Sequence, residues 1–158
     1  MAKAYPSWFL SLRQFVLNVF AKYSLPQWIV FVMDISAVLI TFLFAYLLRF
    51  NLDVHSVPFP LAWYQTILVI IVFGIMSFAF RSYSGLIRHT TLTDISLMFI
   101  VTTLSSLILI IISYFTRFLD IWPLLNIPLS ILVIHYVTIT VFLFSVRVII
   151  KIIFRFVT

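Results

Sequence analysis

Four long apolar segments, separated by short polar turns, dominate the pattern of this chain. They cover residues 27–50, 61–80, 95–115 and 127–146. Each holds roughly 20 residues or more, and a helix of that length, at about 1.5 Å per residue, spans the hydrocarbon core of a bilayer. Because lipid offers no hydrogen-bond partners, the backbone groups of a spanning segment must pair within that segment. The pattern therefore predicts an all-α membrane protein with a four-transmembrane-helix bundle as its domain, residues 27–158.

A different pattern precedes the first apolar segment, within residues 1–26. From Ser7 to Tyr23 apolar residues recur at the helical period, while polar residues share the opposite stripe. This predicts an N-terminal amphipathic helix that lies in the cytoplasmic headgroup layer of the membrane. The alternative is a soluble helix packed on a domain outside this chain. Arg13 interrupts the apolar run, which argues against a signal peptide.

Composition excludes several kinds of site. The chain is 65% hydrophobic and 9% charged, against about 25% charged residues in soluble proteins. It has no cysteine and only two glycines, so neither a thiolate metal site nor a glycine-rich nucleotide loop is expected. The three histidines are far apart and have no acidic partner at metal-ligand spacing. We therefore expect no catalytic residue, no cofactor and no metal site in this chain.

The distribution of basic residues predicts an orientation. Two of the ten basic residues, Arg49 and Arg117, fall on one side of the predicted bundle. The others fall on the opposite side: Lys3, Arg13, Lys22, Arg81, Arg88, Arg147, Lys151 and Arg155. The positive-inside rule predicts cytoplasmic termini and a cytoplasmic middle loop. The net charge of +6 then indicates anionic lipid headgroups as partners rather than nucleic acid.

Small or weakly polar residues recur at helical spacing along each apolar segment. Such stripes favour close packing of helices, so we expect a compact bundle rather than four separate anchors. The four stripes are Asp34, Ala37, Thr41 and Ala45; Thr66, Ile70, Gly74 and Ser77; Ser96, Thr103, Ser106 and Ser113; and His135, Thr138 and Ser145.

Two ionisable residues lie within the predicted spans. Asp34 is the only acidic residue well inside one, where a carboxylate costs roughly 2.5–3.5 kcal/mol at the helix centre. It is either a proton or cation site, as in small exporters, or a structural carboxylate paired with a basic residue at the cytoplasmic end. We favour the structural role, with Arg147 as the first choice of partner. For His135 we expect a neutral, hydrogen-bonded core residue rather than a switch or a ligand.

The middle loop is the most distinctive polar stretch of the chain. We expect Thr93 or Asp94 to cap the third span and Gly85 to support a tight turn. One interpretation is a pair of positive-inside arginines followed by a helix cap. The other is a docking site that contacts the phosphate of an anionic lipid or of a pyrophosphate-linked substrate. Its candidate residues are Arg81, Tyr83, Gly85, Arg88 and Asp94.

The run from Tyr83 to Asp94 resembles the pattern tyrosine, x, glycine, leucine, x, arginine, then serine or threonine and aspartate. That pattern occurs in the N-terminal membrane region of bacterial membrane-bound nucleotide-sugar epimerases and dehydratases of polysaccharide biosynthesis. Asp34, residues 45–50 and Arg147 also fit, so the resemblance covers residues 26–156. The four-span region of polyprenyl-phosphate sugar-phosphate transferases is similar.

In that family the spans precede a Rossmann domain that binds NAD(P) and carries a catalytic tyrosine–lysine pair, which this chain lacks. The resemblance therefore implies a non-catalytic anchor and docking module in the bacterial inner membrane. Its partners would be the catalytic domain or another glycan-assembly protein, anionic lipids or an isoprenoid phosphate, and a homo-oligomer is compatible with it. The alternatives are a small four-span transporter or flippase for a lipid-linked sugar or a cation, and a purely structural assembly protein.

Overall fold

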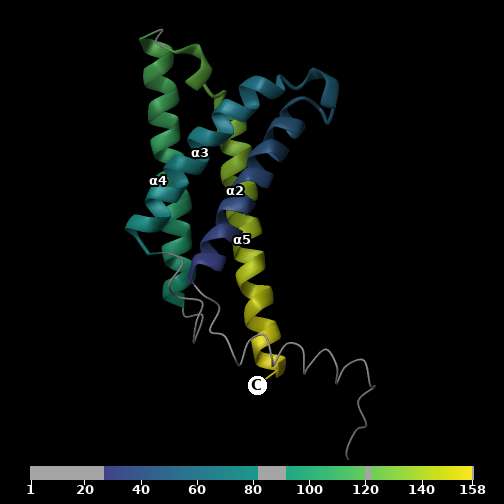
Figure 1. The fold of residues 1–158 in the computed structure, drawn as a ribbon, viewed down its shortest axis with the longest axis vertical. Coiled ribbons are helices and arrows are strands. Elements are labelled where there is room, and N and C mark those ends of the chain that lie inside the picture. The colour runs from purple at the N-terminus through teal and green to yellow at the C-terminus, as the bar shows by residue number, and fades with distance from the viewer. Residues whose placement is uncertain (1–26, 82–91, 120–121, 158) are drawn as a thin grey trace, which may run out of the picture.

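The computed structural model describes residues 27–81, 92–119 and 122–157 (Figure 1). The described residues form an all-α bundle, as the sequence predicts. Its four long helices are α2 (Gln27–Arg49), α3 (Phe59–Ala79), α4 (Leu92–Phe118) and α5 (Leu129–Val157). Two short 3-10 helices, η1 (Val54–Ser56) and η3 (Pro123–Leu125), lie in the connections. The amphipathic helix predicted within residues 1–26 lies outside the described residues.

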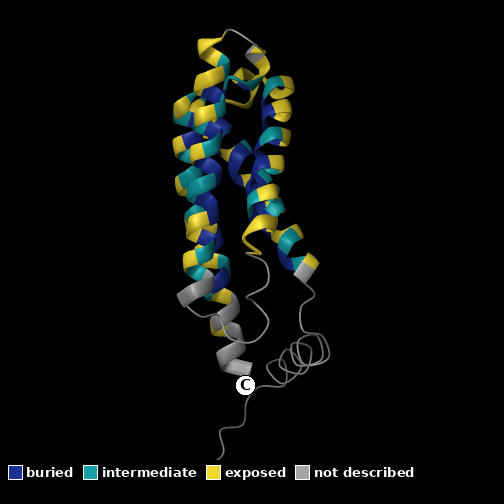
Figure 2. Cartoon of the chain, turned by 90° about the vertical axis from the view of Figure 1, so that its left-hand side faces the viewer, coloured by how far each residue is buried: buried dark blue, intermediate teal, exposed yellow. Residues whose placement is uncertain are grey.

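All four long helices are long and apolar enough to cross a membrane. The spanning segments are Trp28–Arg49, Phe59–Ala79, Ile95–Phe118 and Leu129–Ile149. Between 28% and 39% of the residues in an 18-residue stretch of each segment are buried inside the bundle. The buried residues line the interior, and the outer surface carries exposed apolar side chains (Figure 2). A soluble protein would hide those side chains, whereas in a bilayer they meet lipid. The chain is therefore a multi-pass membrane protein.

The helices form a closed ring in chain order. α2 packs on α3, α3 on α4, α4 on α5, and α5 returns to α2. Consecutive helices run antiparallel, so α2 begins and α5 ends at the same end of the bundle (Figure 1). We call this the basic end, because Arg81 and Arg147 lie there. The opposite end, which carries η1 and η3, is the loop end.

The helix cap predicted at the start of the third span is wrong, and the fourth helix is longer than its predicted span. α4 begins at Leu92, so Thr93 and Asp94 lie in its first turn and do not cap it. α5 continues to Val157, although its apolar segment was expected to end at residue 146. The reason is the same in both cases: a hydropathy pattern marks the part of a helix that meets lipid. Backbone hydrogen bonding continues into the polar region beyond.

The loop end of α2 closes with a Schellman motif. The Leu52 N–H donates to the Leu47 carbonyl at 2.7 Å, and the Asn51 N–H donates to the Leu48 carbonyl at 3.2 Å. Asn51 adopts the left-handed conformation that the motif requires, with φ of 53°. At the basic end, Arg81 takes a similar φ of 48° directly after α3. Gly85, at which a tight turn is expected, lies outside the described residues, so that turn stays a prediction.

The predicted small-residue stripes are confirmed fully only in α2. Asp34 and the other three members of that stripe are all buried. In the remaining helices Ser96 and Ser145 are exposed, while Thr102 and Ser105, which were not expected, are buried. The helical period shows which residues share a face of a helix. It does not show whether that face packs on another helix, because a serine or threonine side chain is small enough for a helix–helix contact or for a lipid-facing surface.

Candidate functional site

The deepest ionic contact of the described residues joins α2 to α5 near the basic end. Arg147 Nη2 lies 3.3 Å from Asp34 Oδ2, and the two side chains are only 3% and 7% exposed. By helical rise, Asp34 lies about 10 Å from the first residue of α2, close to the membrane boundary. This is the partner that the sequence predicted for Asp34. A guanidinium beside a buried carboxylate offsets part of the cost of placing either charge in a span.

A second polar contact links the same two helices about two turns further into the membrane. His135 Nδ1 lies 3.3 Å from Thr41 Oγ1, and the Thr41 hydroxyl lies 2.8 Å from the Ala37 carbonyl. With its single hydrogen donated to Ala37, the hydroxyl accepts from the Nδ1–H tautomer of His135. The imidazole and the Phe42 ring pack in a T-shaped arrangement, with centroids 5.3 Å apart. The predicted hydrogen-bonded core position of His135 is confirmed.

Gln65 connects three elements near the loop end. The Tyr46 hydroxyl of α2 donates to the Gln65 amide oxygen, and the Gln65 amide nitrogen donates to the Leu124 and Asn126 carbonyls at 3.1 and 3.3 Å. Gln65 is fully buried. Its amide therefore donates to carbonyls of the η3 connection, which in a regular helix would accept from backbone N–H groups of that helix. The sequence analysis missed this residue, although a glutamine within an apolar segment was a usable signal.

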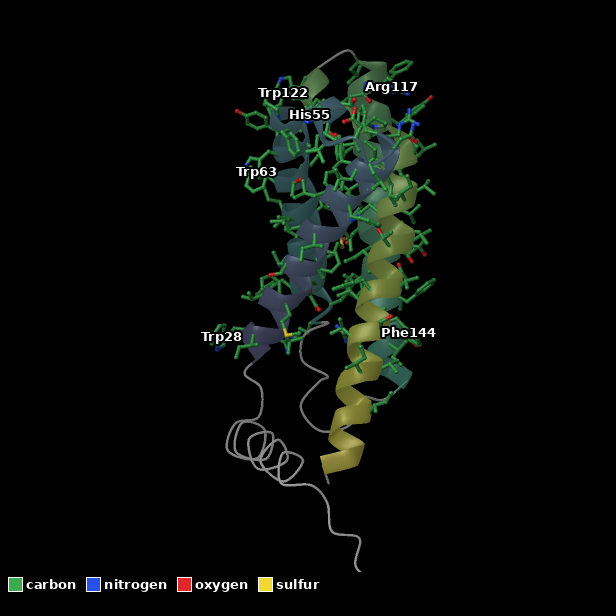
Figure 3. All side chains as sticks on the ribbon, turned by 90° about the vertical axis from the view of Figure 1, so that its right-hand side faces the viewer. Trp28, His55, Trp63, Arg117, Trp122 and Phe144 are labelled. Atoms are coloured by element: carbon green, nitrogen blue, oxygen red, sulfur yellow. The ribbon has the colours of Figure 1, made fainter. Side chains whose placement is uncertain are left out.

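Ser113 of α4 makes a similar contact from the other side of η3. Its hydroxyl donates to the Ile127 carbonyl at 2.6 Å, and Ile127 itself is buried. The connection between α4 and α5 is thus held against the bundle by side chains of two helices. Trp63 and Trp122 are exposed at this end, while Trp28 projects outward at the basic end (Figure 3). Tryptophans at both ends match the two interfacial belts of a membrane protein.

Most of the predicted docking residues are not described by the structure. Arg81 is exposed at the basic end, at the end of α3. Tyr83, Gly85 and Arg88 lie outside the described residues. Asp94 lies in the first turn of α4, but its side chain is outside the description. A docking role for this group therefore stays a prediction.

Two shallow apolar grooves flank α5 on the membrane-facing surface. One, of about 540 Å³, lies between α2 and α5 and includes Thr41 and Thr138. The other, of about 500 Å³, lies between α4 and α5 and includes Phe99 and Thr140. Val141 lines both grooves. Each is large enough for part of a hydrocarbon chain, and each lies within the spanning segments.

Comparisons with known proteins add nothing to these features. No protein-family description, no curated protein and no solved structure matches the chain significantly. Within the described part of the chain, no group of three or more histidine, cysteine, aspartate or glutamate residues could hold a metal ion. Some of the described polar side chains join helices to one another or to the η3 connection, and many others bond to a carbonyl of their own helix.

Proposed function

We propose that this chain is a non-catalytic membrane anchor and docking module for a bacterial cell-surface polysaccharide enzyme of the nucleotide-sugar dehydratase or epimerase type. The contact between Asp34 and Arg147 is the observation that carries this proposal, because it pairs the carboxylate of α2 with a basic residue of α5 and so holds the two helices together. An anchor needs a bundle of constant geometry. Polar contacts between helices at three depths supply it: Asp34–Arg147, Thr41–His135 and Tyr46–Gln65.

The basic end is the proposed docking end, and we place it in the cytoplasm on the positive-inside rule. Arg81 is exposed there, and α5 extends eight residues beyond its spanning segment, from Ile149 to Val157. The resemblance of Tyr83–Asp94 to the membrane region of nucleotide-sugar enzymes supports the same end. The natural partner would be an NAD(P)-binding catalytic domain at the inner leaflet, where sugar nucleotides are available.

Site-specific photocrosslinking in native membranes tests the docking role. A photoreactive amino acid placed at position 81 should form an adduct with an NAD(P)-binding nucleotide-sugar enzyme, identified by mass spectrometry. The matched control is the same amino acid at position 117, which is also an exposed arginine but lies at the loop end. Equal adducts at both positions, or adducts at position 81 without any sugar-nucleotide enzyme, would count against docking.

Orientation is tested separately by labelling. The chain has no cysteine, so Arg81→Cys and Arg117→Cys each introduce a single thiol. A membrane-impermeant maleimide added to intact cells should label only the Arg117→Cys protein. Labelling of the Arg81→Cys protein instead would place the basic end outside and reverse the proposed topology.

The competing function is proton-coupled transport, for which the carboxylate of Asp34 within a span is the supporting observation. Proteoliposomes with an imposed pH gradient separate the two functions. An anchor should show no gradient-driven movement of a polyprenyl-phosphate sugar. Flux that Asp34→Asn abolishes would favour a transporter and overturn the anchor.

A further inference from the structure

We draw no further inference here: the strongest candidate, the apolar groove between α4 and α5 on the membrane-facing surface, carries none, because nothing in the described part of the structure shows what covers it.

Discussion

Asp34 and Arg147 are 113 residues apart in the chain, yet their side chains meet at 3.3 Å inside the bundle. They come from the first and last described helices, so their contact lies in the interface that closes the ring of four. A charge in this setting is tolerated because its counter-charge is within reach. We therefore expect the two residues to act as a unit, so that removing one should destabilise the bundle more than replacing both by apolar residues.

Removal of one member of the pair should destabilise the protein strongly. Asp34→Ala leaves the Arg147 guanidinium buried without this carboxylate, and we expect a loss of about 3–5 kcal/mol in the free energy of unfolding. Replacing both residues by apolar ones, Asp34→Leu with Arg147→Met, should recover most of that loss. Equilibrium unfolding in mixed detergent micelles measures both effects. A double variant as unstable as the single one would show that the pair does not act as a unit.

Gln65→Leu should loosen the loop end. The substitution removes the donors to the Leu124 and Asn126 carbonyls and the acceptor for Tyr46, at an expected cost of about 1–3 kcal/mol. Hydrogen exchange should accelerate at the Leu125 and Ile127 amides, which bond within this connection. Tyr46→Phe removes only the hydroxyl and is the milder control. Unchanged exchange in Gln65→Leu would mean that η3 is held by packing alone.

Gly74→Ala should be tolerated. A Cβ at this position would lie 3.7 Å from Ile35 Cδ1 and 3.8 Å from Phe31 Cζ, which are ordinary contact distances. Alanine also favours a helix over glycine by about 1 kcal/mol in water, so the free energy of unfolding should stay level or rise. Gly74→Leu should lose about 1–3 kcal/mol by overpacking against Ile35. A large loss in Gly74→Ala would indicate closer approach of the backbones than the structure shows.

Asp53, in the connection after α2, should titrate below an ordinary aspartate. The Ser56 hydroxyl and the His55 N–H both donate to its carboxylate and lower its pKa from the usual 3.8. A lowered folded-state pKa contributes stability above the unfolded pKa, and that contribution is lost as the pH falls through the folded value. Carbon-13 NMR titration of the carboxyl measures the pKa directly. Ser56→Ala should move it back toward 3.8, and an unchanged value would show that this hydroxyl bond is absent in solution.

The sequence predicted the spans well where the apolar segment and the helix have nearly the same bounds. α3 runs from Phe59 to Ala79 against a predicted segment of residues 61–80. α5 shows the limit of that approach, because its helix continues through Lys151 and Arg155 although its apolar run ends earlier. Charged residues lie outside the hydrocarbon core but do not end a helix. Hydropathy therefore does not show where a helix ends within the headgroup region.

The polar contacts were predictable only in part. Arg147 was the first choice for Asp34 because charge and depth allow few partners for a carboxylate in a span. Gln65 stands out as a polar residue within an apolar segment, but its partners could not be predicted, because two of them are backbone carbonyls of the η3 connection and a residue pattern does not show where a carbonyl lies. Ser145 was expected in the bundle interior and is exposed, since a serine that bonds to its own helix, as it does to Val141, needs no neighbour.

The sequence by itself determined that this protein is a set of four membrane-crossing helices, with eight of its ten basic residues on one side of the spans. That much follows from the requirement that backbone groups pair within each segment in lipid. Only the tertiary structure decided which faces turn inward, how closely Asp34 and Arg147 approach where α2 closes on α5, and that two grooves flank α5. Helical periodicity relates residues along one helix, whereas rotation and depth relative to a neighbour are set by side-chain packing between helices.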